Sequence, residues 1–126
     1  MVPRLNLVVL HAADPVGLAG FYSEFGLEFV RHRHGTGPEH FACEGEGGVF
    51  EIYPATPRQG PTSGLRLGFE VEDVIAAAEC LSKAGASILS APGTSPSGLR
   101  AVLQDPEGNK IDLTESRESS KRAPGS

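Results

Sequence analysis

Three charged side chains stand where the surrounding pattern is apolar. Glu51 interrupts one apolar run, Asp112 interrupts a second, and Arg66 lies near the start of a third. A carboxylate in a dry site acts as a general base when its pKa is raised. An arginine between two carboxylates either forms a structural ion cluster or uses its planar fork of donors to orient a polar ligand. Such a cluster would lower the pKa of Glu51, which counts against the general-base role.

All four histidines lie in the first half of the chain. We expect them on the surface or at the rim of a site: His11, His32, His34 and His40. As an alternative, His40 joins a divalent-metal site with Glu51 and Asp112, because imidazole and carboxylate groups are common metal ligands. His11 lies four residues beyond Leu7 on one strand, about 13 Å away, so it does not replace residue 7.

Tyr53 and the two cysteines complete the set of reactive residues. Strand alternation puts Tyr53 on the same face as Glu51, where we expect it to stack on a ligand or hydrogen-bond to it. Cys43 and Cys80 have no CxxC pattern and no basic neighbour that would activate a thiol. We therefore expect two buried thiols in a reducing cytoplasm.

An internal duplication relates the charged residues to one another. Residues 5–14 and residues 64–73 are both apolar runs that end in Asp, and a helical pattern follows each run. The acids that end the two runs, Asp14 and Asp73, are 59 positions apart. Glu51 and Asp112 are 61 positions apart. Similar offsets at both ends of a segment indicate a duplicated unit of about 60 residues.

The local signals predict an α+β fold of two tandem β-α-β-β-β modules. Each predicted helix has an Asp N-cap and a Gly just past its end. The predicted helices are 15–26 and 74–85, and the predicted strands are 5–14, 29–34, 39–44, 48–53, 64–73, 87–91, 99–105 and 109–114. We expect one domain over 1–115, with module one at 5–55, a linker at 56–64, module two at 65–115, and a polar, disordered tail at 116–126.

Strand alternation predicts which side chains face away from the helices. The apolar faces must cover the helices, so the charged residues point to the other side of each sheet. Two such sheets would form a curved, cup-shaped mixed sheet with the helices outside. Its predicted lining is Leu7, Val9, Glu51, Tyr53, Arg66, Glu70, Val102, Gln104, Lys110 and Asp112. Pseudo-symmetry predicts that residues 7, 51, 66 and 112 meet at the centre.

Several segments together resemble a known family. They are Asp14 with Phe21-Tyr22, Gly26-Leu27, Phe50-Glu51-Ile52-Tyr53, and the run from Asp105 to Leu113. Their order and spacing resemble the vicinal oxygen chelate superfamily, which includes glyoxalase I, extradiol dioxygenases and the bleomycin and fosfomycin resistance proteins. The resemblance covers residues 5–115. It implies the cup-shaped fold and a homodimer, with each cup built within one chain or between two.

The resemblance also implies where a metal ion would bind. Metal-dependent members hold a divalent ion with a residue from the opening and closing strands of each module. The matching positions are Leu7, Glu51, Arg66 and Asp112. Leu7 has no donor atom and Arg66 is a cation, so we expect no metal and no other cofactor.

Composition narrows the function further. The 126 residues carry a net charge of -5, with no basic stripe and no long apolar run. We therefore expect no nucleic-acid partner and no membrane partner. The leading hypothesis is a metal-independent protein that binds a small polar or aromatic organic molecule through Leu7, Tyr53, Arg66, Val102, Gln104 and Asp112. The alternatives are a glyoxalase-like lyase or isomerase with Glu51 as general base, and a metalloenzyme with a rearranged site that includes His40.

Overall fold

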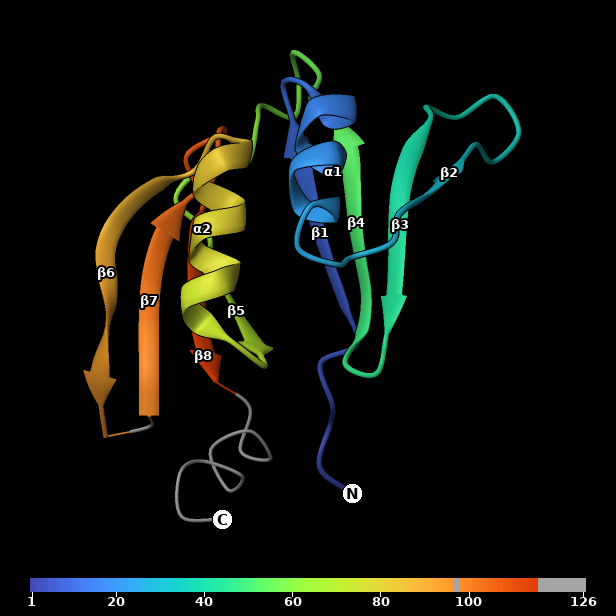
Figure 1. The fold of residues 1–126 in the computed structure, drawn as a ribbon. Helices are drawn as coiled ribbons and strands as arrows, with labels where there is room; N and C mark the ends of the chain where they lie inside the picture. Colours follow the sequence, from blue (N-terminus) through green and yellow to red (C-terminus); the bar gives the residue numbers. More distant parts are fainter. Residues whose placement is uncertain (97, 116–126) are drawn as a thin grey trace. The chain divides into compact units, whose positions relative to one another are not determined.

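The computed structural model describes residues 1–96 and 98–115. It divides the chain into two compact units between Thr62 and Ser63. Each unit is a β-α-β-β-β module with one four-stranded mixed sheet and one helix (Figure 1). The predicted α+β fold of two tandem modules is therefore confirmed. The tail at 116–126, predicted to be disordered, lies outside the described residues.

Module one pairs its first and last strands in parallel. The strand order is β1-β4-β3-β2, and β1 runs parallel to β4 whereas the other pairs are antiparallel. α1 packs on β1, β3 and β4 and so covers one face of this sheet, and the face without a helix is called the open face below. The bounds are β1 (Leu7–Ala12), α1 (Pro15–Ser23), β2 (Val30–His32), β3 (His40–Gly45) and β4 (Gly48–Pro54).

Module two repeats this topology with the order β5-β8-β7-β6. β5 and β8 are parallel, and α2 packs on β6, β7 and β8. The edge strand β6 continues to Ser95, well beyond the predicted 87–91, through two irregularities in its pairing with β7. The bounds are β5 (Arg66–Val71), α2 (Val74–Ala84), β6 (Ser87–Ser95), β7 (Gly98–Gln104) and β8 (Lys110–Glu115).

Equivalent aspartates begin both helices. The side chain of Asp14 accepts a hydrogen bond from the Gly17 amide at 3.0 Å, and Asp73 accepts one from the Ala76 amide at 3.0 Å. Each satisfies one of the amides that a helix leaves unpaired at its start. α1 ends at Ser23, three residues earlier than predicted. Neither helix of the described residues is long and apolar enough to cross a membrane.

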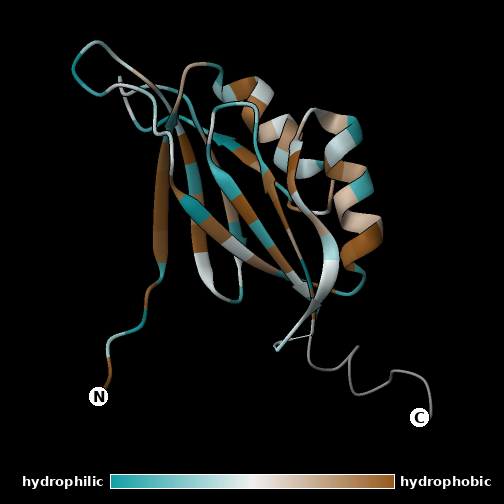
Figure 2. Cartoon of the chain, turned by 90° about the vertical axis from the view of Figure 1, so that its left-hand side faces the viewer, coloured by the Kyte–Doolittle hydropathy of each residue, from teal (hydrophilic) through white to brown (hydrophobic). Residues whose placement is uncertain are grey.

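Each core lies between the helix and one face of its own sheet. In module one Tyr22 is fully buried and meets Phe50 edge to face at 5.3 Å. Ile52 and its module-two counterpart Leu113 are also fully buried. Polar and apolar residues alternate along several strands (Figure 2), so polar side chains gather on the faces away from the helices, where Leu7 and Val9 are also exposed.

Two tight turns hold the closing strands in register. Gly48 begins β4 with φ 123°, and a Cβ there would collide with the backbone of Asn6. In the turn at 105–109, Asp105 accepts hydrogen bonds from the amides of Glu107 and Asn109, and Gly108 has a positive φ of 92°. The first turn connects β3 to β4, and the second connects β7 to β8.

The cysteines differ from the prediction in one respect. Cys43 is buried as expected, but Cys80 is only partly buried because its position on α2 lies beside the core-facing stripe.

Candidate functional site

Glu51 and Asp112 occupy equivalent positions in the two modules. Glu51 on β4 is the register partner of Val9 on β1, and Asp112 on β8 is the register partner of Gly68 on β5. The two pairs of register partners, Val9 with Glu51 and Gly68 with Asp112, are therefore related by the duplication. Both acids lie on the open face of their own sheet, as the alternation predicts. Their meeting in a shared cup stays a prediction.

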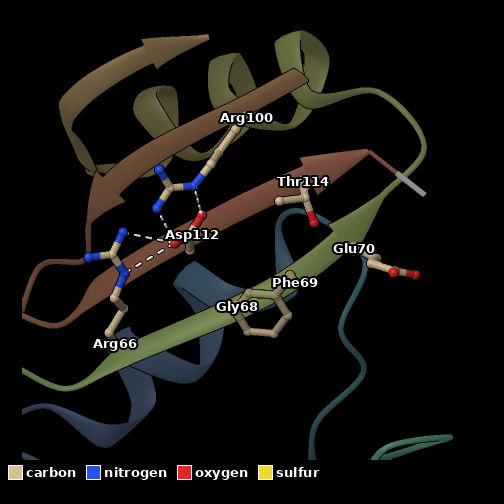
Figure 3. Close-up of a pocket in the computed structure, with 7 residues that line it drawn as sticks. All are labelled: Arg66, Gly68, Phe69, Glu70, Arg100, Asp112 and Thr114. Carbon is tan, nitrogen blue, oxygen red and sulfur yellow. Dashed lines mark hydrogen bonds and ion pairs between the residues drawn. The ribbon is translucent and has the colours of Figure 1, made fainter. Parts of the chain in front are cut away.

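Asp112 is held by two arginines from neighbouring strands of module two. Arg66 on β5 donates from Nε and Nη2 to Oδ2 at 3.1 and 2.8 Å. Arg100 on β7 donates from Nε to Oδ1 at 2.8 Å and from Nη2 to Oδ2 at 2.6 Å. Both guanidinium groups converge on the carboxylate (Figure 3). The Arg66–Asp112 part of the predicted Glu51–Arg66–Asp112 cluster is thus present, and the place of Glu51 in that cluster stays a prediction. Asp112 Oδ2 accepts three of the four hydrogen bonds.

These residues line an open pocket of about 410 Å³ within module two. The ion cluster forms one end of the pocket, and Glu70 and Thr114 lie farther along the same strands (Figure 3). Gly68 lies opposite Asp112, and a Cβ at this glycine would meet nothing within 4 Å. The lining is Arg66, Gly68, Phe69, Glu70, Arg100, Asp112 and Thr114.

The arginines change the protonation chemistry of the acid. The hydrogen bonds from Arg100 lower the pKa of Asp112 below its ordinary value; burial opposes this, and Arg66 lowers the pKa further. In return, the carboxylate raises the pKa of Arg100. Asp112 is therefore an ionised acceptor and not a proton donor at neutral pH.

Arg100 was missed at the sequence level. Its position on β7 gives it the same face as Val102 and Gln104, which the sequence analysis did place in the lining. Alternation along this strand was therefore the signal that could have found it. Neither Val102 nor Gln104 is among the residues that line the pocket of module two. Val102 is the register partner of Asp112, and Gln104 Nε2 lies 3.4 Å from the Gly108 carbonyl oxygen.

Module one places a buried imidazole beside its acid instead. His40 Nε2 lies 3.7 Å from Glu51 Oε2, and His40 Nδ1 lies 3.4 Å from the carbonyl oxygen of Pro38. The imidazole also stacks on Tyr53, with ring centroids 4.2 Å apart and planes 4° from parallel. The expectation of an exposed or rim position for His40 is wrong, because only 2% of its side chain is exposed.

The other histidines continue a row of rings across this sheet. His11 lies 6.0 Å from Tyr53 on one side, and His32 lies 5.8 Å from His40 on the other. His34 lies 5.2 Å from His40. His32 and His34 are exposed as expected, and His11 is partly buried. The row covers His40 from both sides, which explains its burial.

Two of the four positions where the resemblance would place metal ligands carry side chains that do not ligate a cation. Leu7 is about half exposed and has no donor atom, and Arg66 is a cation bonded to Asp112. Asp112 Oδ2 already accepts hydrogen bonds from three N–H groups. Among residues 1–96 and 98–115, no group of three or more His, Cys, Asp and Glu side chains is arranged to hold one ion.

We predict that Asp112→Asn destabilises the protein and flattens its acid response. At neutral pH the free energy of unfolding should fall by about 1–2 kcal/mol, because two half-exposed guanidinium groups lose their shared counter-charge. A lowered pKa in the folded state gives stability that is present above the unfolded pKa of about 3.9 and is lost as pH falls through the folded value. Urea unfolding between pH 7 and pH 2 measures both effects.

The matched control for this experiment is Glu70→Gln, which removes a pocket carboxylate that bonds neither arginine. It should keep the wild-type loss of stability below pH 4. A wild-type acid response in Asp112→Asn would contradict the assigned role of the ion cluster.

We predict that His40→Ala lowers the free energy of unfolding by about 1–3 kcal/mol, since it removes a buried, stacked ring. His34→Ala, at an exposed member of the same row, should cost less than about 0.5 kcal/mol. Chemical denaturation of both variants measures the difference. Equal costs would show that burial of His40 contributes nothing.

Comparison with known proteins identifies the family to which this chain belongs. The family model for the glyoxalase/bleomycin resistance protein/dioxygenase superfamily matches residues 4–113. No curated protein matches the chain closely enough to count as a relative.

Three solved structures illustrate the likeness in fold. TnmS3, an antibiotic-binding protein from Streptomyces sp. CB03234, is 23% identical, with 90% of this chain and 96% of that chain covered and a TM-score of 0.72. A glyoxalase-related enzyme from Fulvimarina pelagi is 22% identical, with 91% and 89% covered and a TM-score of 0.67. A family enzyme from Burkholderia phytofirmans PsJN is 22% identical, with 90% and 98% covered and a TM-score of 0.71. Because the family model spans nearly the whole described chain, this protein belongs to the glyoxalase/bleomycin resistance protein/dioxygenase superfamily.

Proposed function

We propose that this chain is a metal-independent binding protein for a small polar or aromatic organic molecule. One observation carries the proposal: Asp112, which stands at a metal-ligand position of the family, is bonded to Arg66 and Arg100. A metal ion at this carboxylate would have to displace three hydrogen bonds from Oδ2 and approach two cations. The same guanidinium groups suit a ligand, because each presents a planar set of N–H donors.

Binding without chemistry needs only a shaped pocket and a few oriented polar groups. Module two supplies both in the open pocket beside the ion cluster. The similar fold of TnmS3, described as an antibiotic-binding protein, is consistent with such a role. Sequestration of a small molecule is therefore the role that we favour.

A second candidate function rests on module one. There the Glu51 carboxylate is 20% exposed and lies 3.7 Å from the buried His40 imidazole. A carboxylate beside an imidazole is an arrangement that serves proton transfer, so Glu51 would act as the general base of a lyase or isomerase. The same two side chains could instead supply one nitrogen and one carboxylate to a rearranged metal site.

We further propose a cytoplasmic homodimer. The cytoplasmic location rests on the two thiols, Cys43 and Cys80. The homodimer is an expectation from family resemblance.

Protein purified without a histidine tag or chelator should contain no stoichiometric divalent ion, and EDTA should leave its melting temperature unchanged. A screen of metabolites and antibiotics should find a compound that raises the melting temperature with or without EDTA. A ligand at 100 times its Kd adds about 2.7 kcal/mol to the apparent stability. A tightly held ion, or a ligand effect that EDTA abolishes, would overturn the metal-independent proposal.

Glu51→Gln separates the two candidate functions. For a binding protein, the Kd of the compound found in the screen should change by less than about twofold. For an enzyme that uses Glu51 as its base, turnover of that compound should fall by about 10²–10⁴-fold. Calorimetry measures the first quantity and mass spectrometry of the products the second. Glu44→Gln, an exposed acid on the adjacent strand β3, is the matched control and should change neither.

A further inference from the structure

We propose that the pocket of module two binds a compact organic acid with one carboxylate and a hydroxyl group at its far end. Arg66 and Arg100 would hold the carboxylate, and Glu70 and Thr114 would hold the hydroxyl. This inference rests on the proposed function and adds the chemical class of the ligand.

The arginine end of the pocket has unused donor capacity. A guanidinium has five N–H groups. Arg66 and Arg100 each use two of them on Asp112, which leaves three on each side chain. Within the described residues neither guanidinium bonds to any other acceptor. The side chains are 49% and 39% exposed, so the remaining N–H groups are accessible to a ligand.

The charge balance selects a monoanion. Two guanidinium groups on one ionised carboxylate leave a net charge of +1 at this end of the pocket. One ligand carboxylate neutralises that charge, and its planar geometry matches the guanidinium fork. A dianion would leave excess negative charge in a pocket that also contains Glu70.

The opposite end of the pocket fits a hydroxyl group. Glu70 and Thr114 are register partners on β5 and β8. They stand two residues along from Gly68 and Asp112, a separation of about 7 Å along the strands. Thr114 is also the register partner of Arg100, whose guanidinium is turned toward Asp112, and Figure 3 shows Thr114 and Glu70 on the side of Asp112 away from both guanidinium groups. A carboxylate oxygen and a hydroxyl can together accept from and donate to one ligand hydroxyl.

Gly68 leaves the space between the two ends open. Its hypothetical Cβ has no neighbour within 4 Å, so a larger side chain there would enter the pocket without a backbone clash. Because Gly68 has no side chain, the floor of the pocket is open between the two guanidinium groups and Glu70. A ligand of about 7 Å between its two polar groups would lie over this glycine.

The test titrates the full chain with 4-hydroxybenzoate as the probe, followed by NMR chemical shifts. This compound carries a carboxylate and a hydroxyl on opposite ends of one ring. We expect shifts centred on β5, β7 and β8, with binding at least about tenfold weaker for 4-hydroxybenzamide, which lacks the charge, and several-fold weaker for benzoate, which lacks the hydroxyl. Equal binding of the acid and the amide would overturn the inference.

Variants assign the effect to the pocket. Arg66→Gln should weaken 4-hydroxybenzoate binding by at least about tenfold, and Gly68→Val should weaken it by filling the floor. Lys83→Gln removes an exposed charge from α2, outside the lining of this pocket, and should bind as wild type does. Circular dichroism and melting temperature confirm that each variant folds. Wild-type binding by Arg66→Gln would overturn the inference.

Failure of this inference is distinguishable from failure of the proposed function. If neutral compounds bind in the presence of EDTA while 4-hydroxybenzoate does not, the ligand class is wrong and metal-independent binding stands. If 4-hydroxybenzoate binds through Arg66 but only in the absence of EDTA, the ligand class stands and metal independence is wrong.

Discussion

The chemistry of module two depends on a single carboxylate shared by two guanidinium groups. Asp112 fixes the orientation of Arg66 and Arg100, two long side chains that would otherwise move freely in solvent. The price in conformational freedom is offset by four charge-assisted hydrogen bonds. The result is a preorganised cation of net charge +1 beside an open pocket, and preorganisation of this kind lowers the entropy that a ligand loses on binding.

The same scaffold position has a different environment in each module. Glu51 and Asp112 occupy matched register positions on closing strands, yet Glu51 lies beside a buried imidazole and Asp112 beside two arginines. The duplicated backbone therefore sets where an acid stands, and its neighbours on adjacent strands set what that acid does. The same fold can therefore hold different chemistry at equivalent positions.

Much of the fold could be predicted from the sequence because its signals are local. Asp caps, glycine stops and alternating side chains depend on residues a few positions apart, and they correctly predicted both helices and all eight strands. The boundaries moved where local signals are weak: α1 ends early at Ser23, and β6 continues to Ser95 as an irregular edge strand. The Arg66–Asp112 pair followed from strand alternation together with the repeat.

The sequence by itself determined the two-module α+β architecture and the open-face positions of Glu51, Arg66 and Asp112. Only the tertiary structure decided that Arg100 completes the ion cluster and that His40 is buried against Tyr53. The physical reason is that both facts depend on partners from neighbouring strands. Strand register and side-chain rotamers decide which groups meet across a sheet, and these are set by the packing of the whole module, not by neighbours along the chain.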